Sequence, residues 1–156
     1  MTPQRATPEE QQGSPMKIKR IEHVAIAVDN IAQMRDIFEN KLGIAMEYEE
    51  HMPEYDTTLA MFPVGETYLE LLQSDNAESG TGRWIRERGE GLYHICLEVE
   101  DIDAAMSELS GKGVTFQSEK PMIGHGNSRI VFLDPRCTGN LVIELAELPA
   151  DAVHHG

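Results

Sequence analysis

An internal repeat constrains this chain more than any other feature of its sequence. Residues 22–31 read Glu-His-Val-Ala-Ile-Ala-Val-Asp-Asn-Ile, and residues 93–102 read Tyr-His-Ile-Cys-Leu-Glu-Val-Glu-Asp-Ile. Each copy then ends in a similar apolar segment, 65–71 in the first and 139–145 in the second. Two units are too few for a solenoid, which needs at least about three, and 156 residues is the length of one domain. The repeat therefore predicts two related modules that share one core.

Both copies show the same order of periodic segments. In the first copy, alternating apolar residues predict a strand over 21–28, and apolar residues at helical spacing predict a helix over 29–42, capped by Asp29 or Asn30 and ended by Gly43. The further expected elements are strands 44–49, 57–62 and 67–73, a connecting helix over 79–87, and then strand 92–99, helix 101–112 and strands 114–117, 128–133 and 140–146. Two βαβββ modules, each with a sheet face that it cannot bury alone, predict an α+β fold in which the modules pair their sheets around a cleft.

The ends of the chain limit the expected domain. Residues 1–16 contain almost nothing apolar to bury, so ordering them would cost chain entropy with little return, and we expect a disordered lead there. His154 and His155 lie at the opposite end and are expected to face solvent, because chain ends fray. The expected limits are 17–148 for a single domain, about 17–75 and 91–148 for its two modules, and 149–156 for a tail.

The composition excludes several classes of partner. The chain carries 13 basic and 27 acidic residues, a formal net charge of -14 at pH 7. That charge repels phosphate backbones and anionic lipid surfaces, so neither nucleic acid nor a membrane is an expected partner. Cys96 and Cys137 are too few for a disulfide framework, and no apolar run approaches the roughly 20 residues that cross a bilayer. Because the amino terminus also lacks a signal-peptide pattern, the expected location is the cytoplasm.

Each copy of the repeat places one His near its start and one Glu near its end. These residues are His23 and Glu70 in the first copy and His94 and Glu144 in the second, at nearly equal spacings. Each Glu lies between apolar neighbours in a predicted strand, where a buried carboxylate must be paired, hydrogen-bonded, protonated or bound to a metal. A lone His or Glu in a strand is usually a satisfied or solvated residue, but recurrence in two modules favours one shared site. Two imidazoles and two carboxylates suit a divalent ion of Zn, Co, Ni, Mn or Fe.

Strand alternation indicates which face of the first strand carries this site. His23 shares a face with Ala25 and Ala27, whereas the larger Val24 and Ile26 point the other way. The larger apolar side chains are expected to pack against the helix. The face that carries His23 is therefore expected to line the cleft between the modules.

Four passages resemble the vicinal oxygen chelate superfamily, to which glyoxalase I and the extradiol dioxygenases belong. They are residues 21–28, 62–72, 88–102 and 134–145, and the resemblance extends over roughly 17–148. Within the superfamily the chain looks most like the methylmalonyl-CoA epimerases, chiefly in the Arg-Gly-Glu-Gly that precedes the second His and in the Thr-Gly turn before the last strand. The resemblance implies the vicinal oxygen chelate fold, a homodimer, and one divalent metal ion per chain bound by His23, Glu70, His94 and Glu144.

The resemblance also implies an activity. Such an epimerase interconverts the 2R and 2S forms of methylmalonyl-CoA by removing the proton alpha to the thioester, and a divalent cation stabilises the charge of the enolate. Inversion needs a base on each face of the carbon, and Glu144 and Glu70, one from each module, are the expected catalytic bases, with Glu144 the stronger candidate. A glyoxalase I-type lactoylglutathione lyase or another metal-dependent isomerase is the alternative. A non-catalytic protein that sequesters a ligand in the cleft is a second alternative.

Two positions depart from the epimerase pattern. Where some relatives carry a Glu on the second long strand of the first module, this chain has Thr57 and Thr58, and the nearest carboxylate is Asp56. Residues 134–137 read Asp-Pro-Arg-Cys in place of the usual His-Pro-Lys-Ser. An acyl-CoA substrate would also need local cations on this acidic chain, and six are available: Arg83, Arg86, Arg88, Lys120, Arg129 and Arg136.

Overall fold

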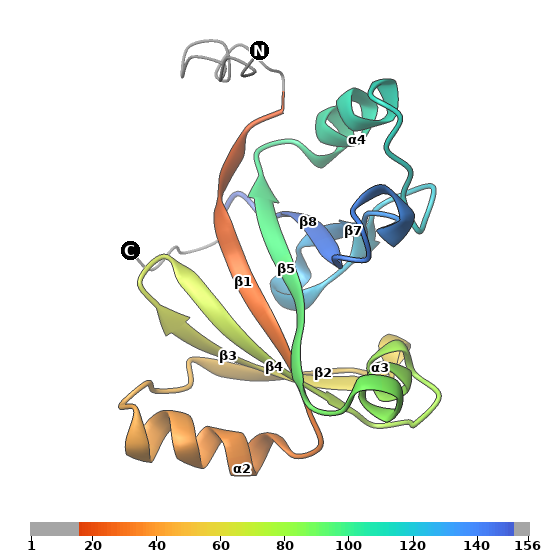
Figure 1. Cartoon of the computed structure of the whole chain (residues 1–156). Coiled ribbons are helices and arrows are strands. Elements are labelled where there is room, and N and C mark those ends of the chain that lie inside the picture. The colour runs from red at the N-terminus through yellow and green to blue at the C-terminus, as the bar shows by residue number, and fades with distance from the viewer. Residues whose placement is uncertain (1–15, 152–156) are drawn as a thin grey trace, which may run out of the picture.

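The computed structural model describes residues 16–151 of the chain. The expected lead, except for Met16, and the tail residues His154 and His155 lie outside this described part, and the proposed domain limits stay a prediction. Each module begins with a long strand that is followed by a helix (Figure 1). In chain order the elements are β1 (Ile18–Val28), α2 (Ile31–Asp36), η1 (Ile37–Lys41), β2 (Tyr48–Met52), η2 (Pro53–Tyr55), β3 (Thr57–Val64), β4 (Thr67–Ser74), α3 (Gly80–Arg88), β5 (Gly91–Val99), α4 (Ile102–Gly111), β6 (Met122–Ile123), η3 (His125–Asn127), β7 (Arg129–Phe132), η4 (Pro135–Cys137) and β8 (Ile143–Glu147).

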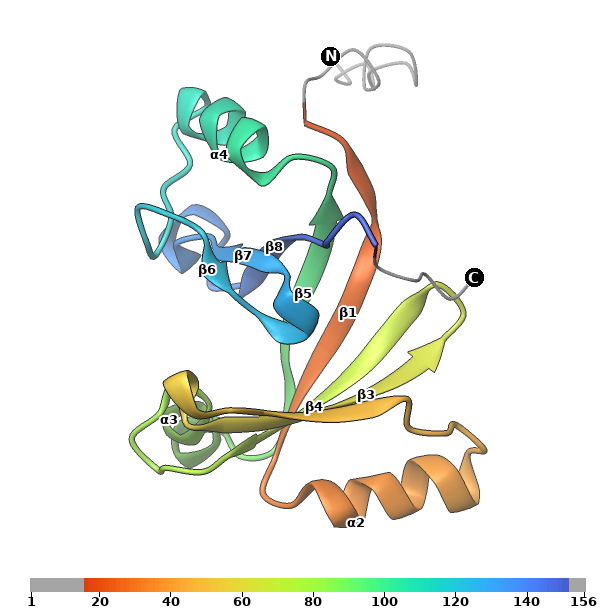
Figure 2. The same cartoon turned by 180° about the vertical axis from the view of Figure 1, so that it is seen from behind.

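The strands of both modules form one sheet in the order β2-β3-β4-β1-β5-β8-β7-β6. At its centre β1 and β5, the first strands of the two modules, pair antiparallel. On either side the last strand of each module pairs in parallel with the first, β4 with β1 and β8 with β5. The two halves of the sheet curl toward the same side of this central pair (Figures 1 and 2). The predicted fold class, two βαβββ modules that pair their sheets, is confirmed.

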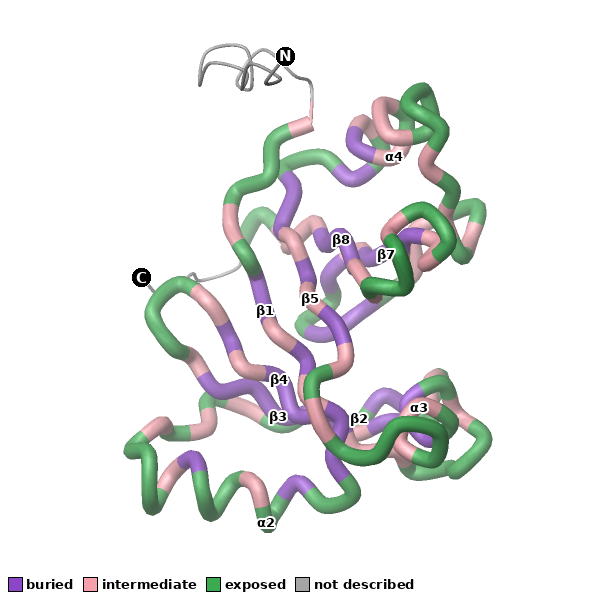
Figure 3. The backbone as a smooth tube through the Cα atoms, viewed as in Figure 1, coloured by how far each residue is buried: buried purple, intermediate pink, exposed green. Residues whose placement is uncertain are grey.

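Apolar side chains bind the helices to the outer face of the sheet. In the first module Val28 and Phe62 pack with Ile31 and Phe38 of the helical segment, and in the second module Ile102 of α4 belongs to the corresponding cluster. The buried stretches follow the strands, whereas most of α2 and the turns are exposed (Figure 3). The α2–η1 segment and α4 thus cover the outer face, and the inner face is left to line a cleft.

The helix expected over 29–42 forms in two parts. Asn30 caps it, since its side chain accepts a hydrogen bond of 3.2 Å from the Gln33 N–H. After Asp36 the α-helix widens into the π-helical turn η1, in which the Leu42 N–H reaches back to the Ile37 carbonyl. Among residues 16–151 no helix combines the length and the apolar character that crossing a membrane requires.

One short strand expected from the sequence is displaced and another does not form, because β2 begins only at Tyr48, near the end of the predicted 44–49, and no strand forms over 114–117. Residues 44–47 are irregular, and within 114–117 only Phe116 makes an isolated bridge. At both places the chain leaves a helix through a glycine with positive φ, Gly43 (72°) or Gly113 (87°). Such a glycine reverses the chain direction at a helix end. The following residues therefore serve as a crossing back to the sheet, and apolar content alone misidentified them as strands.

Candidate functional site

The four residues marked by the repeat lie together on the inner face of the central strands. His23 belongs to β1, Glu70 to β4, His94 to β5 and Glu144 to β8, and none is more than 7% exposed. His23 Nε2 lies 3.2 Å from His94 Nε2. The same nitrogen is 3.1 Å from Glu144 Oε1 and 3.4 Å from Glu70 Oε1. The parallel pairs β1–β4 and β5–β8 produce this convergence, because they set the end of each repeat beside its beginning.

These distances fit the ligands of one divalent ion. Metal–ligand bonds of about 2.0–2.2 Å place neighbouring ligand atoms roughly 3 to 3.5 Å apart. Glu144 Oε1 is buried and makes no hydrogen bond among the described residues, although the His23 ring nitrogen is close to it. A buried carboxylate oxygen needs compensation, which a bound cation supplies. The donor set and its geometry therefore suit a metal.

Two β-bulges precede the two histidines. Along the β1–β5 pair, Ile21 faces Leu97 and His23 faces Cys96, so Glu22 is an extra residue on β1. Further along, Ala25 faces His94 and Ile26 faces Leu92, so Tyr93 is an extra residue on β5. A bulge breaks the strict alternation of a strand and re-aims the side chains beside it. Each module thus carries one bulged residue immediately before its candidate ligand.

The first bulge brings Glu22 into the site, where strict alternation would have excluded it. Glu22 and His23 are each only 1% exposed, and Glu22 Oε2 accepts a hydrogen bond from His23 Nδ1. Glu22 Oε1 lies 3.1 Å from His125 Nε2, a charge contact rather than a well-directed hydrogen bond. The Tyr48 hydroxyl is 2.8 Å from His125 Nδ1. A buried polar chain therefore runs from β2 through the β6–β7 turn to His23.

Sequence reasoning missed Glu22, Tyr48 and His125 for a physical reason. His125 lies in η3, on a turn whose counterpart in the first module, η2, carries no His. The repeat therefore held no signal for it. For Glu22 the only signal was its place next to His23, and the bulge that turns it inward depends on pairing with β5.

Burial and neighbouring charges shift the pKa values of these groups in opposite directions. Burial would raise the pKa of Glu144, but contacts with His23 and His94 outweigh it and hold that pKa well below its ordinary value. Burial would likewise raise the pKa of Glu22, yet His125 and His23 keep it low. In the reverse sense, burial would lower the pKa of His23, whereas nearby acidic groups, Glu70 first among them, hold it well above the usual range. His23 and the carboxylates around it thus stabilise each other's charged forms.

Cys96 is the remaining polar group at this centre. It lies opposite His23 in the β1–β5 pairing, and its Sγ is within 4.8 Å of ligand atoms of His23 and Glu144. Burial raises the pKa of the Cys96 thiol, which keeps it protonated and poorly nucleophilic. The thiol is packed among Ile130 and Ala146 of the second module.

A cavity of about 470 Å³ opens onto the site. Glu70, His94 and Glu144 line it from the central strands, and Tyr93 and Arg83 line it from the side of α3. The guanidinium of Arg83 has no hydrogen bond or ion pair within the described residues. The cavity thus extends from the carboxylate-rich centre to Arg83, whose guanidinium is left to interact with whatever enters the cavity.

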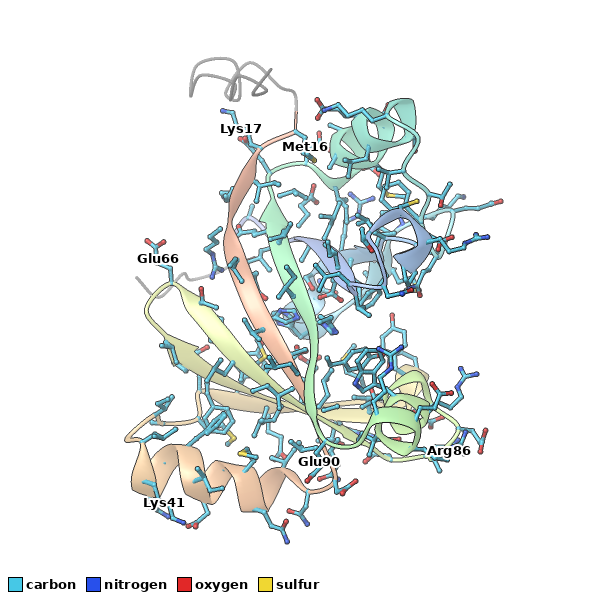
Figure 4. All side chains as sticks on the ribbon, viewed as in Figure 1. Met16, Lys17, Lys41, Glu66, Arg86 and Glu90 are labelled. Carbon is cyan, nitrogen blue, oxygen red and sulfur yellow. The ribbon has the colours of Figure 1, made fainter. Side chains whose placement is uncertain are left out.

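The other cations expected to attract phosphate groups lie elsewhere. None of them lines the cavity. Arg86 is 2.9 Å from Glu78 and its side chain points away from the sheet (Figure 4), and Arg88 lies over the Trp84 ring, 3.8 Å from its centre. The acidic partners of Arg129 and Arg136 are Asp103 and Asp134, respectively.

At the position on the second long strand where some relatives carry a Glu, this chain has threonines. A carboxylate is present instead on the neighbouring strand, β2. Thr57 and Thr58 hydrogen-bond to the Tyr55 carbonyl and to Asp75, and Asp56 accepts a hydrogen bond from Asn76. On β2, however, exposure alternates so that Glu50 is less exposed than its neighbours on either side. Glu50 Oε1 accepts a hydrogen bond of 2.9 Å from the Gly126 N–H, next to His125. The first module therefore does carry a carboxylate that faces the β6–β7 turn and is not a candidate ligand.

This fold and this buried site define a class of protein. Residues 22–132 match the Glyoxalase/Bleomycin resistance protein/Dioxygenase superfamily, and the chain belongs to this superfamily. Among its relatives is the mitochondrial methylmalonyl-CoA epimerase of Homo sapiens, 30% identical over 136 residues that cover 86% of this chain and 77% of the human protein. The uncharacterized protein YqjC of Bacillus subtilis is 31% identical over 134 residues, covering 86% and 96%.

A solved structure shows the same likeness in three dimensions. It is a variant of methylmalonyl-CoA epimerase from Streptomyces coelicolor in complex with 2-nitronate-propionyl-CoA. The two chains superpose with a TM-score of 0.84 at 28% identity, covering 88% of this chain and 99% of that one. The resemblance to the vicinal oxygen chelate group that includes the methylmalonyl-CoA epimerases is confirmed.

Proposed function

We propose that this protein is a metal-dependent epimerase that interconverts the 2R and 2S forms of methylmalonyl-CoA. The observation that carries the proposal is the convergence of two imidazoles and two carboxylates, with Glu70 and Glu144 contributed by different modules on either side of His23. The relatives named above supply the substrate class. A site built only to sequester a ligand would have no need to bury four such groups together.

The reaction has two requirements that the protein must meet. It must stabilise negative charge on the thioester oxygen, and it must hold a proton acceptor and a proton donor on opposite faces of the alpha carbon. A bound divalent ion, held by His23, Glu70, His94 and Glu144, would supply Lewis-acid stabilisation of that charge. Two imidazoles and two carboxylates suit a divalent ion of Zn, Co, Ni, Mn or Fe.

The acid and base are assigned to carboxylates from the two modules. Glu144 and Glu70 are related by the internal repeat and approach His23 from different strands, which supports the pair as bases on opposite faces. A carboxylate that binds a cation is a weaker base, because the positive charge lowers its pKa. Glu50, which is not a candidate ligand, is therefore a second candidate for the base supplied by the first module.

Arg83 is the proposed contact for the anionic part of the substrate. It lines the cavity and its guanidinium makes no hydrogen bond or ion pair within residues 16–151. Arg83→Ala should raise the KM for methylmalonyl-CoA about tenfold, the effect of losing one charge-assisted hydrogen bond, with little change in kcat. Arg86→Ala is the matched control, since Arg86 lies on the same helix but binds Glu78. Equal KM values for the two variants would exclude Arg83 as the contact.

Solvent-deuterium incorporation into methylmalonyl-CoA tests the function as a whole. The metal-loaded protein should exchange the alpha proton, and metal removal by a chelator should stop the exchange. A parallel assay with methylglyoxal and glutathione tests the lyase alternative. Turnover there, with no exchange in methylmalonyl-CoA, would replace the epimerase with a lactoylglutathione lyase.

We also propose a homodimer located in the cytoplasm. Leu92, Ile18 and Ile21 of the central strand pair are 74%, 51% and 44% exposed, which supports burial of this face against a second copy. Both cysteines are free thiols, as a reducing compartment requires. Light scattering on the purified protein tests the dimer, and a single-chain mass would exclude it.

A further inference from the structure

We infer that Glu22 is the positioning residue of the metal centre: it orients His23 and links this ligand to the contact between the two modules through His125 and Tyr48. The inference rests on the metal site of the proposed function. It concerns how tightly that site holds its ion, and it does not depend on which substrate the protein converts.

The bulge in β1 is the first observation. If β1 alternated regularly here, Glu22 would point away from His23, to the outer face of the sheet where the helices pack. The bulge instead turns both Glu22 and His23 inward and leaves each 1% exposed. Burying a carboxylate is costly unless it is paired. The pairing that Glu22 finds is with the candidate metal ligand itself.

The contact between Glu22 and His23 uses the ring nitrogen that is not directed at the other ligands. His23 Nδ1 donates to Glu22 Oε2, while His23 Nε2 faces His94, Glu70 and Glu144. A carboxylate on one imidazole nitrogen fixes the tautomer and the ring orientation and increases the basicity of the other nitrogen. Glu22 thereby holds Nε2 toward the centre of the site, so that its lone pair is already aimed at an ion that displaces the Nε2 proton.

The second module provides an internal comparison for this role. Its bulged residue is Tyr93, which lies edge to face with His94, the ring centres 5.0 Å apart, and stacks on Trp84. His94 Nδ1 is buried and has no hydrogen-bond partner among the described residues. On its Nδ1 side His94 is therefore held by packing, whereas a hydrogen-bonded carboxylate holds the Nδ1 side of His23. His23 is thus the ligand whose orientation the protein fixes most firmly.

His125 and Tyr48 extend the support of His23 across the cleft. His125 Nε2 faces Glu22 Oε1 at 3.1 Å, and the Tyr48 hydroxyl forms a hydrogen bond of 2.8 Å with His125 Nδ1. Tyr48 belongs to β2 of the first module and His125 to the β6–β7 turn of the second. Tyr55 adds a parallel link, because its hydroxyl donates to the Ile123 carbonyl at 2.6 Å. The orientation of Glu22 therefore depends on how the β6–β7 turn is seated against the first module.

The affinity of the purified protein for Co²⁺ or Zn²⁺, measured by competition with a chromophoric chelator, tests the inference. Glu22→Gln keeps the size of the side chain and an oxygen that accepts from His23 Nδ1, but it removes the charge. The Kd for the metal should rise about 10- to 100-fold, the usual effect of losing such a supporting group. The visible absorption spectrum of the Co²⁺ form should change in the same variant, because the position of one ligand is relaxed.

Two control variants separate positioning from general stability. Glu98→Gln alters a glutamate that is equally buried, at 2% exposure, but lies against Lys19 (3.4 Å) and Arg20 (2.7 Å) rather than a candidate ligand. Tyr93→Phe alters the bulged residue of the second module. Both should keep the wild-type Kd, even where Glu98→Gln lowers the unfolding temperature. An equal rise of Kd in Glu22→Gln and Glu98→Gln would overturn the inference, as would an unchanged Kd in Glu22→Gln.

If Glu22→Gln does not fold, Tyr48→Phe tests the inference in its place. It removes only the hydroxyl at the far end of the chain and should raise the Kd by about tenfold or less, and an unchanged Kd would count against the inference. If the wild-type protein binds no divalent ion, the metal centre and the inference both fail. If it binds the ion with the expected dependence on Glu22 but shows no exchange in methylmalonyl-CoA, the proposed substrate fails and the inference stands.

Discussion

The two modules share one plan and differ at the residue that precedes the histidine. In the first module a bulged glutamate hydrogen-bonds the histidine, and in the second a bulged tyrosine packs against it. The repeat thus supplies symmetric ligands, whereas the neighbouring residues make their surroundings unequal. Inversion of a carbon centre requires two groups in different protonation states, since at any moment the group on one face must act as the base and the group on the other face as the acid.

The largest expected difference between the modules concerns the two glutamates. Glu144→Gln should lower the rate of alpha-proton exchange about 10²- to 10⁴-fold, because the amide cannot take up a proton. Glu70→Gln should lower the rate at least about tenfold less, since among the described residues Glu70 lies within 4.0 Å of the ring nitrogen of His23, whereas Glu144 lies that close to both histidines. Exchange of the 2R and 2S substrates, measured separately, checks this. Equal losses in the two variants would show that the modules contribute equally.

The second comparison concerns the two histidines and metal affinity. His23→Ala should weaken metal binding about ten times more than His94→Ala, because only His23 is oriented by a carboxylate. Calorimetric titration of the metal-free variants with Zn²⁺ gives both affinities. A weaker effect at His23 than at His94 would reverse the asymmetry described above.

The stability of the metal-free protein should depend on pH through the contact between Glu22 and His125. The Glu22 charge outweighs burial and raises the pKa of His125, so the stability that this pair contributes is present below the ordinary His value of 6.5 and is lost as pH rises through the raised pKa. The lowered pKa of Glu22 acts on the acid side, where stability is lost as pH falls below 4.5 toward the folded-state value. Thermal unfolding from pH 3 to 9 should show both losses.

Glu22→Gln provides the control for that pH dependence. It removes the Glu22 carboxylate, on which the raised pKa of His125 and the acid-side titration both depend. The losses of stability at high and at low pH should therefore become shallower in this variant. Tyr93→Phe, in the second module, should keep the wild-type profile. Identical profiles for wild type and Glu22→Gln would show that other groups cause the pH dependence.

The smallest expected difference concerns the two helix caps. Asn30 and Asp101 each accept a hydrogen bond from a backbone N–H in the first turn of their helix, at 3.2 and 3.0 Å. Replacing either with Ala should lower the free energy of unfolding by about 1 kcal/mol. Asp101→Ala should cost a further ~0.3–1 kcal/mol at low salt, because the charged cap also interacts with the helix dipole. Urea unfolding at two salt concentrations measures both, and a salt-independent difference would exclude the dipole contribution.

The sequence predicted the long elements and failed at the short ones. The long strands, the connecting helix and α4 follow from periodicity, because their residues alternate or recur at helical spacing over eight or more positions. The strands expected over 44–49 and 114–117 did not form as predicted, since short apolar runs after a glycine can equally be crossings. β6, with two residues, is too short to leave any pattern.

The sequence by itself determined the doubling of the fold and the identity of four convergent side chains. It could do so because a repeat marks equivalent positions regardless of how the chain folds. Only the tertiary structure decided that Glu22 faces the site, that His125 reaches it from an unrepeated turn, and that Arg83 alone among the expected cations lines the cavity. Each of these depends on a bulge, a turn or a helix orientation, and contacts between distant strands fix those features.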